Sequence, residues 1–237
     1  MKKLLGEEEF SCYEESLSRE RVYGIRLNNK KGSSEYIEQL LKMSGLWEEC
    51  GLKKVPWIPN GYYASDTSML SAHPYYRAGL YYIQEPSAMT PARSLPVEPE
   101  DRVLDMCAAP GGKATQLSAC LSQKGFLLAN DISASRGRAL LKNLEMSGAD
   151  SFCVTAEDPK RLAAVYPEYF DKILLDAPCS GEGMFRRDPK AVGAWIGKGP
   201  EFYAAIQEEL LECAVKMLKA GGMMVYSTCT FSIKENE

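Results

Sequence analysis

Five short apolar segments alternate with helix-forming segments from residue 86 onward, and this alternation restricts the possible folds more than any other feature of the sequence. The apolar segments span residues 102–107, 125–131, 151–156, 171–177 and 222–229. Each is almost continuously apolar, as strands covered on both faces are. Helical periodicity predicts intervening helices over residues 112–123, 134–147 and 200–219. The order of elements therefore predicts an α/β fold with a doubly wound parallel sheet in residues 86–237.

Residues 1–85 have a different pattern, which predicts a small α+β domain. Leu4 to Leu17 has the pattern of an acidic amphipathic helix, residues 21–28 alternate like a strand, and residues 34–43 are again helical. A chain of 237 residues is long enough for two modest domains. We expect a truncated chain, because it stops at KENE directly after the fifth apolar segment, in the first turn of a further predicted helix.

Charge and composition argue against several classes of protein. The net charge is −4 and the isoelectric point about 5.3, so binding to phosphate backbone over the whole surface is not expected. No stretch approaches about 18 apolar residues and no apolar segment follows the N-terminal lysines, so we expect neither a membrane span nor a secretory signal. Eight cysteines without a C-x-x-C pair and a single histidine, His73, predict a reduced cytosolic protein without a metal site.

The turn after the first predicted strand has the sequence DMCAAPGGK, residues 105–113. Its Gly111-Gly112 pair lets the backbone approach a ligand at a helix N-terminus, which favours a nucleotide-like cofactor, although a tight structural turn explains this motif equally well. Asp131 follows the second strand, where an acid can hold ribose hydroxyls or cap the helix that starts at Ser133. Asp158 follows the third strand and could accept an adenine amino hydrogen or begin a helix.

Two cysteines follow the fourth and fifth predicted strands. DAPCSGEGMF places Asp176 and Cys179 at one strand end, and STCTFS places Cys229 at the next. Ligands of open α/β sheets bind outside the carboxyl ends of the strands, so these residues converge on the mouth of the cofactor site, where access and dipoles can lower a thiol pKa. The remaining cysteines are expected to be packing residues: Cys12, Cys50, Cys107, Cys120, Cys153 and Cys213.

Long motifs in this order resemble those of a known family. DMCAAPGGK, DAPCSGEGMFRRDP and YSTCTFS, with YIQEPSAM before the first strand, are similar to motifs of the S-adenosylmethionine-dependent RNA cytosine-5 methyltransferases of the Nol1/Nop2/Sun family. The similarity extends over nearly the whole chain. It implies a Rossmann-like methyltransferase sheet in residues 86–237 that is incomplete at its C-terminus, and an RNA-binding domain in residues 1–85. It also implies S-adenosylmethionine as the cofactor and a cytosine of ribosomal RNA, 16S in particular, as the substrate.

The resemblance also implies a role for individual residues. The loop around the methionine part of the cofactor would be Cys107, Ala108, Ala109, Pro110, Gly111, Gly112 and Lys113. Asp131 matches the ribose ligand, Arg136 a residue beside the cofactor, and Asp158 the adenine contact. Asp176 matches the acid of the strand-four motif, which is expected both at the cofactor and in catalysis.

The same resemblance gives the two cysteines different tasks. C5 of cytosine is a poor nucleophile, but a thiolate that adds at C6 makes the ring enamine-like, so that C5 can attack a sulfonium methyl group. Cys229 matches this nucleophile, and Cys179 matches the cysteine that assists the later elimination. Asp176, if kept protonated near the base, could stabilise charge at N3.

An RNA substrate requires local contacts, because the target base must leave its stack before it enters such a pocket. Two basic clusters could bind the RNA backbone or form ordinary solvated turns: Arg186, Arg187 and Lys190, and Arg26, Lys30 and Lys31. Four tyrosines could stack on bases, although core packing is expected for at least half of them: Tyr75, Tyr76, Tyr81 and Tyr82.

Two other functions fit the sequence. The chain could be a non-catalytic RNA-binding or ribosome-assembly factor on a methyltransferase scaffold, or a transfer-RNA cytosine-5 methyltransferase. Methylation of an exocyclic or protein nitrogen is disfavoured, because DAPCSG stands where an Asn/Asp-Pro-Pro-aromatic motif would be expected. The sequence does not predict an oligomeric state.

Overall fold

The computed structural model describes residues 2–19 and 21–237. Contacts divide the chain into two compact units. The larger unit comprises Val22–Asp176 and Leu210–Ser227; the smaller comprises the N-terminal residues through Arg21 together with Ala177–Glu209 and Thr228–Glu237. These two units do not correspond to the predicted domains 1–85 and 86–237. The boundary between residues 85 and 86 stays a prediction.

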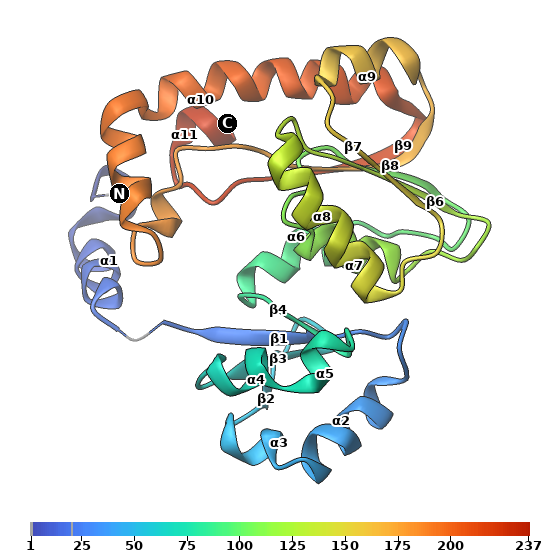
Figure 1. Cartoon of the computed structure of the whole chain (residues 1–237). Helices are drawn as coiled ribbons and strands as arrows, with labels where there is room; N and C mark the ends of the chain where they lie inside the picture. Colours follow the sequence, from blue (N-terminus) through green and yellow to red (C-terminus); the bar gives the residue numbers. More distant parts are fainter. Residues whose placement is uncertain (1, 20) are drawn as a thin grey trace. The chain divides into compact units, whose positions relative to one another are not determined.

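A five-stranded parallel sheet forms the centre of the larger unit (Figure 1). Its strands are β5 (Arg102–Asp105), β6 (Phe126–Asn130), β7 (Phe152–Thr155), β8 (Phe170–Asp176) and β9 (Leu218–Ser227). Their order is β7-β6-β5-β8-β9, so the direction of winding reverses beside β5. This topology confirms the doubly wound sheet. In such sheets ligands generally bind outside the carboxyl ends of the strands where the winding reverses, which here are those of β5 and β8.

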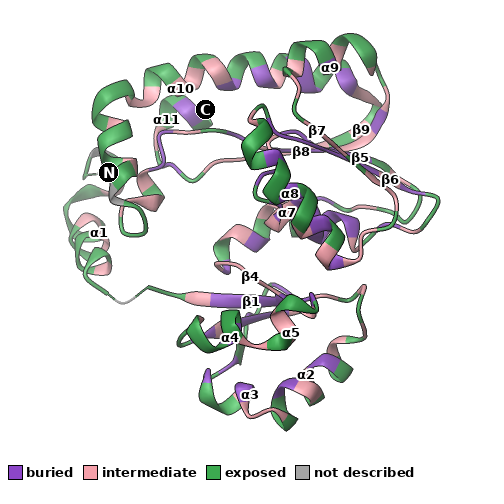
Figure 2. Cartoon of the chain, viewed as in Figure 1, coloured by how far each residue is buried: buried purple, intermediate pink, exposed green. Residues whose placement is uncertain are grey.

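Helices cover this sheet and bury its central strands on both faces (Figure 2). The helical elements of this part are η1 (Ser87–Met89), α6 (Thr90–Ser94), α7 (Gly112–Ser118), α8 (Ala134–Ser147), α9 (Pro159–Val165) and the end of α10 (Pro189–Met217). Consecutive residues of β5 and β8 have no exposed surface: Val103, Leu104, Ile173 and Leu174. Because successive strand residues point to opposite faces, both faces of the sheet are covered, as the continuous apolar segments predicted.

Three predicted helix boundaries differ from the structure. Helix α7 ends at Ser118, not at residue 123. Helix α10 begins already at Pro189, and non-helical backbone at Gly199 interrupts it where the helix start was predicted. Helix α10 ends at Met217, not at residue 219, and the Gly221-Gly222 pair lies within β9. A Cβ at Gly222 would lie 2.9 Å from the carbonyl oxygen of Asp171, so this glycine allows β9 to approach β8 closely.

The predicted N-terminal α+β fold is present within the larger unit. Its antiparallel sheet has the order β2-β3-β1-β4, with β1 (Tyr23–Leu27), β2 (Lys53–Lys54), β3 (Gly61–Ala64) and β4 (Tyr81–Ile83). Its helices are α2 (Ser34–Met43), α3 (Leu46–Glu49), α4 (Ser68–Ala72) and α5 (Pro74–Arg77). Tyr81 is 1% exposed and Tyr75 and Tyr76 pack against the same core, which confirms packing as the role of these tyrosines.

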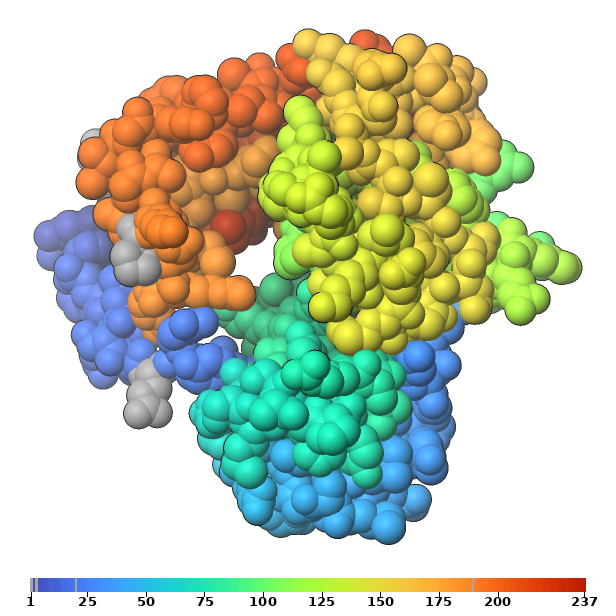
Figure 3. Space-filling model, in the orientation of Figure 1, coloured from blue at the N-terminus to red at the C-terminus, as the bar shows by residue number. Residues whose placement is uncertain are grey.

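Polar contacts fix this small sheet to α7 and α8. The guanidinium of Arg26 donates to the carbonyl of Gly112 at 2.7 Å and to the side chains of Gln116 and Thr115, both at 2.8 Å. The amide of Asn28 donates to the carbonyl of Ser147 at 2.7 Å. In the space-filling view the teal and yellow surfaces of these segments meet directly (Figure 3). Arg26 is therefore buried between elements, and its predicted RNA-backbone contact is wrong.

The smaller unit contains α1 (Lys2–Leu17), η2 (Glu182–Met184), the first part of α10 and α11 (Ile233–Asn236). Helix α1 confirms the predicted helix, but it is interrupted at Gly6 and is not amphipathic, since Leu4 and Leu17 remain 51% and 44% exposed. Among the residues that the structure describes, no helix is both long enough and apolar enough to cross a membrane.

Candidate active site

The loop between β5 and α7 forms the first part of the site. Gly111 is the N-cap of α7 with a φ of 114°, a conformation that glycine adopts without strain. Two side chains of α8 form hydrogen bonds with the loop. Arg136 donates to the carbonyl of Ala109 at 2.9 Å, and Asn143 donates to the carbonyl of Pro110 at 2.7 Å. A Cβ at Gly112 would meet Gln84 and Tyr82 at 3.2 Å, so this glycine accommodates neighbouring side chains of the protein.

Asp105 ends β5 and is fully buried directly before this loop. Neither of its carboxyl oxygens has a hydrogen-bond partner among the described residues. Burial raises the pKa of Asp105 to about 8; the ammonium of Lys113 opposes this increase, whereas the carboxylates of Asp176 and Asp131 add to it. Asp105 is not among the residues predicted for the site, although an acid at the end of the central strand is a signal in the sequence.

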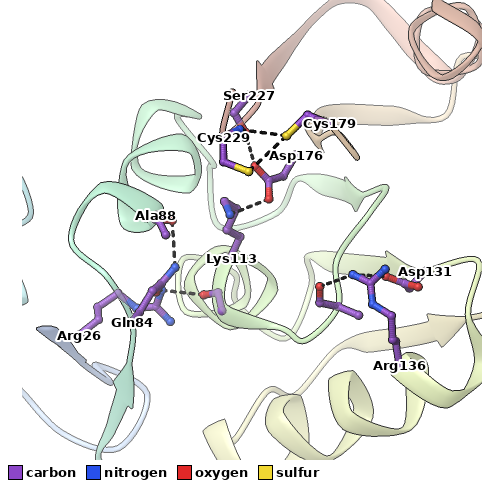
Figure 4. Close-up of polar contacts among 12 residues, drawn as sticks. Arg26, Gln84, Ala88, Lys113, Asp131, Arg136, Asp176, Cys179, Ser227 and Cys229 are labelled. Atoms are coloured by element: carbon purple, nitrogen blue, oxygen red, sulfur yellow. Dashed lines mark hydrogen bonds and ion pairs between the residues drawn. The ribbon is translucent and has the colours of Figure 1, made fainter. Parts of the chain in front are cut away.

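Asp131 lies at the end of β6 and is 2% exposed. It forms an ion pair with Arg136 at 3.2 Å (Figure 4). It also accepts a hydrogen bond from the backbone of Ser133 at 3.0 Å. Ser133, not Asp131, is the N-cap of α8. Of the two alternatives for Asp131, capping is therefore excluded, and Asp131 and Arg136 form one acid–base pair at the strand ends.

Asp158 and Cys107 have the more ordinary structural roles that the sequence left open. Asp158 is the N-cap of α9, and its carboxylate accepts from the backbone of Lys160 at 2.8 Å. Burial raises the pKa of the Cys107 thiol to about 12, and nearby aspartates add to this increase. Cys107 is therefore an unreactive packing residue of the loop, while its backbone can still line a ligand.

A second acid–base pair joins the first turn of α7 to β8. Lys113 forms an ion pair with Asp176 at 2.7 Å, and the hydroxyl of Ser227 donates to the other oxygen of Asp176, also at 2.7 Å (Figure 4). Asp176 and Ser227 are direct neighbours in the parallel register of β8 and β9. Sequence reasoning named Asp176 and Lys113 but missed both their pairing and Ser227, because strand register is set by tertiary structure.

Cys179 and Cys229 meet within the smaller unit. Their sulfur atoms are 3.2 Å apart, and the backbone N–H of Cys229 also donates to the sulfur of Cys179 at 3.3 Å (Figure 4). Hydrogen bonding to Cys229, then burial, raises the pKa of Cys179. The sequence analysis expected a lowered thiol pKa here, and for Cys179 the direction is the opposite, because two adjacent sulfurs favour sharing one proton over ionising both.

The predicted basic clusters lie in different surroundings. Arg186 donates to the carbonyl of Ser16 at 2.6 Å. Arg187 is exposed in the same turn, and Lys190 is exposed in the first turn of α10. Lys30 pairs with Asp150 at 2.9 Å. Burial thus removes Arg26 from the second cluster, whereas the cluster after Cys179 and the exposed Lys31 stay candidates for RNA contact.

The strand ends of the larger unit have a composition that fits a cationic nucleotide-like ligand. Asp131 is paired with Arg136 and Asp176 with Lys113, which leaves the buried carboxyl group of Asp105 without a basic partner of its own. A positively charged ligand group would supply what this carboxyl lacks. The arrangement therefore offers a rim of acids for a polar cofactor and, in the smaller unit, a pair of thiols for covalent chemistry.

A family model described as 16S rRNA methyltransferase RsmB/F matches residues 92–237, which is more than half of the chain. The chain belongs to this family. A second model, described as the N-terminal domain of 16S rRNA methyltransferase RsmF, matches residues 1–86. Membership of the RsmB/F family confirms the resemblance that the motifs indicated.

Curated relatives agree with the F type within this family. Over 219 residues, or 90% of this chain, the identity is 40% to ribosomal RNA small subunit methyltransferase F of Aliivibrio fischeri (strain MJ11) and 41% to that of Escherichia coli O1:K1 / APEC. The segments GEGMFRRDP and IQEPSAM also resemble the F type. The match covers 46% and 45% of these two proteins, so the chain spans about half the length of the curated relatives it matches.

Solved structures of RsmB/F-like architecture share the fold. A methyltransferase homolog protein from Pyrococcus horikoshii is 29% identical with a TM-score of 0.80, covering 99% of this chain and 77% of the other. NSun6 from Pyrococcus horikoshii is 24% identical with a TM-score of 0.83, covering 99% and 82%. The Rossmann-like methyltransferase fold is thus established for this chain, together with the small N-terminal sheet.

Proposed function

We propose that this protein methylates C5 of a cytosine in 16S ribosomal RNA, with S-adenosylmethionine as the methyl donor and a covalent bond between Cys229 and C6 of the base. The observation that carries the proposal is the pair of sulfur atoms 3.2 Å apart, Cys179 following β8 by three residues and Cys229 following β9 by two. Membership of the RsmB/F family supports the reaction class, and the curated relatives support the substrate.

The reaction requires one sulfur to add to the base and later to leave it. The Cys229 thiolate adds to C6, the C5=C6 electrons become nucleophilic at C5, and C5 accepts the methyl group. A water molecule then takes the C5 proton, the electrons of the C5–H bond restore the C5=C6 double bond, and the Cys229 sulfur leaves C6 as a thiolate. The same sulfur must first bond to C6 and later leave it. A proton donor beside this sulfur makes it a better leaving group.

Cys179 fits the role of that donor. Its raised pKa keeps it protonated, and it lies within hydrogen-bonding distance of the Cys229 sulfur. As the bond to C6 breaks, negative charge returns to Cys229, and a hydrogen bond from Cys179 stabilises it there. We therefore assign the release step to Cys179 as an acid, not as a thiolate.

For the cofactor we propose that the strand ends of the larger unit hold S-adenosylmethionine. When bound, it supplies an electrophilic methyl group on a positively charged sulfur. The loop of residues 107–113 would surround its methionine part, with Asp131 at the ribose and Asp158 at the adenine. The orphaned carboxyl of Asp105 and the two acid–base pairs support a cationic ligand in this crevice.

Asp176 is a different case, because both of its oxygens already accept hydrogen bonds, from Lys113 and Ser227. This is the bonding pattern of a carboxylate. We propose that Asp176 orients Lys113, whose ammonium is then the group that can donate toward a base. A cytosolic location follows from the chemistry, since two adjacent thiols must stay reduced to perform it.

The test is methyl transfer to 16S ribosomal RNA by the purified protein, read by bisulfite sequencing. Cys229→Ala should lower methyl transfer more than about 10³-fold and form no protein–RNA adduct. Cys179→Ala should accumulate an adduct that survives denaturing electrophoresis and disappears after nuclease treatment. Small and similar losses from both substitutions would identify the two thiols as packing residues and refute the proposal.

A further inference from the structure

A buried carboxylate lies behind the two cysteines and has no part in the reaction described above. Glu235, in α11, is 4% exposed. One of its oxygens accepts from the backbone N–H of Ser180 at 2.9 Å and from the side-chain amide of Gln207 at 3.0 Å, and the other accepts from the hydroxyl of Ser180. A carboxylate is costly to bury unless it is hydrogen-bonded, and these bonds concentrate on the residue next to Cys179.

The contacts of Glu235 continue on both sides of Cys179. The amide of Gln207 also donates to the carbonyl of Pro178 at 2.8 Å, so the residues before and after Cys179 are both held by the same small network. The hydroxyl of Ser180 lies 2.7 Å from that of Thr230, the residue after Cys229. Glu235 therefore ties the backbone around Cys179 to the loop that carries Cys229.

The Cys229 loop has a second support that does not involve Glu235. The carboxylate of Glu182 accepts from the backbone of Phe231 at 2.9 Å and from the hydroxyl of Thr230 at 3.2 Å. The backbone of Gly183 donates to the carbonyl of Cys229 at 2.9 Å. Removal of Glu235 should thus displace Cys179 more than Cys229.

We propose that Glu235 is a positioning residue that holds the Cys179 thiol against the Cys229 sulfur, and that it thereby controls the release of the methylated base and not its attack. The assignment to release rests on the proposed function. The positioning itself does not, because the distance between two sulfurs can be tested without RNA. Glu235 acts on Cys179 through its hydrogen bonds with Ser180 and Gln207.

The first experiment measures that distance chemically. Diamide removes one hydrogen atom from each of two adjacent thiols, leaving a disulfide and a hydrazine, and the linked peptides are quantified by mass spectrometry. Glu235→Ala should form the Cys179–Cys229 disulfide about tenfold more slowly than the unmodified protein. Glu235→Gln should stay within about threefold, because its amide oxygen still accepts from Ser180 and Gln207.

A matched control comes from the adjacent residue of the same helix. Lys234 pairs with Glu201 at the surface, with both side chains more than 60% exposed, so Lys234→Ala should leave the rate of disulfide formation unchanged. Alkylation of the buried Cys213 reports on global unfolding. A wild-type rate for Glu235→Ala, a Gln variant as slow as the Ala variant, or a slow rate accompanied by labelling of Cys213 would each overturn the positioning role.

The second experiment tests the link to release. Glu235→Ala should accumulate the protein–RNA adduct as Cys179→Ala does, and should add nothing further in a Cys179→Ala background. An additional loss in that background, or loss of adduct formation itself, would refute control of release. Absence of methylation and of adducts in the unmodified protein, with the diamide results as expected, would refute the proposed function and leave the positioning role intact.

Discussion

Asp105 combines complete burial with two carboxyl oxygens that lack hydrogen-bond partners among the described residues. Burial raises its pKa to about 8, so the folded protein keeps this carboxyl largely protonated at neutral pH. In the unfolded chain the same group ionises near pH 4. The folded state therefore binds a proton more tightly than the unfolded state, and the stabilisation is fully present below about pH 4 and is lost as pH rises toward 8.

This difference predicts the effect of Asp105→Asn, which keeps the shape of the side chain but cannot ionise. Between pH 5 and pH 9 the free energy of unfolding of the unmodified protein should fall by up to about 4 kcal/mol relative to that of the variant. Urea denaturation at both pH values measures it. Asp150→Asn, at a half-exposed ion pair, is the control and should show a difference below about 1 kcal/mol. If the free energy of unfolding changed with pH in the same way in Asp105→Asn and in the unmodified protein, the carboxyl of Asp105 would not be protonated in the folded state.

At the scale of elements, the small N-terminal sheet is joined to the cofactor loop by one cation. Arg26 donates to Gln84, Gly112, Thr115 and Gln116, and burial lowers its pKa to about 10. The carbonyl of Gly112 belongs to the turn that we propose surrounds the cofactor. Strand β1 therefore takes part in shaping that turn, although it lies some 85 residues earlier in the chain.

Arg26→Lys should accordingly lower both stability and cofactor affinity. A lysine ammonium cannot donate to all four acceptors that hydrogen-bond to the planar guanidinium group of Arg26. We therefore expect the free energy of unfolding to fall by about 2–4 kcal/mol. Isothermal titration with S-adenosylmethionine should show affinity reduced about tenfold. Lys124→Ala, which removes a fully exposed ion pair with Glu100, is the control. Unchanged affinity in Arg26→Lys would mean that β1 does not shape the loop.

Packing between the N-terminal sheet and α8 predicts a second, larger effect. Gly79 has a φ of 72°, and a Cβ there would lie 2.1 Å from the carbonyl oxygen of Met146. Gly79→Ala should therefore cost more than about 3 kcal/mol in thermal or urea unfolding. Gly197→Ala, in α10 with nothing within 4 Å, should be neutral or stabilise by up to about 1 kcal/mol. Equal effects of the two substitutions would show that Gly79 is not packed against the carbonyl of Met146.

The sequence predicted elements well where local pattern and tertiary structure agree. Continuous apolar runs identified all five parallel strands, and parallel pairing then necessarily brought Asp176 and Ser227 to the same edge. Polar partners distant in the sequence could not be predicted. Arg26 and Lys30 are both basic residues near the same strand, and nothing local shows that the partners of Arg26 lie 58 to 90 residues away. The pKa of Cys179 was equally hidden, because its direction depends on a sulfur 50 residues distant.

At the scale of the molecule, the proposed RNA substrate requires a local basic surface, because the net charge of the chain is −4. We expect the RNA backbone to contact three exposed residues after Cys179: Arg186 and Arg187 in a turn and Lys190 in the first turn of α10. Three phosphate contacts to single-stranded RNA predict a slope of about −2 for the logarithm of affinity against that of salt concentration.

Removing two of these charges tests the assignment. The double variant Arg187→Ala with Lys190→Ala should reduce the magnitude of the slope by about 1.4, as measured by fluorescence anisotropy between low and moderate salt. Lys124→Ala should leave the slope unchanged, because this residue follows α7 at the amino-terminal side of β6. A slope that does not respond to the double variant would place the RNA backbone elsewhere.

If the proposed methyl donor binds beside Asp105, we expect its binding to be coupled to the release of protons. A cation that binds beside a group with a pKa of about 8 lowers that pKa, so uptake of a sulfonium-bearing donor at pH 7 should release a proton into solution. The product of methyl transfer has lost that sulfonium charge and should release fewer protons. Calorimetry in two buffers of different ionisation enthalpy would reveal the difference. The site would then bind the positively charged donor in preference to the uncharged product. Because Asp105 is ionised to a greater extent at higher pH, inhibition by the product should weaken as pH rises.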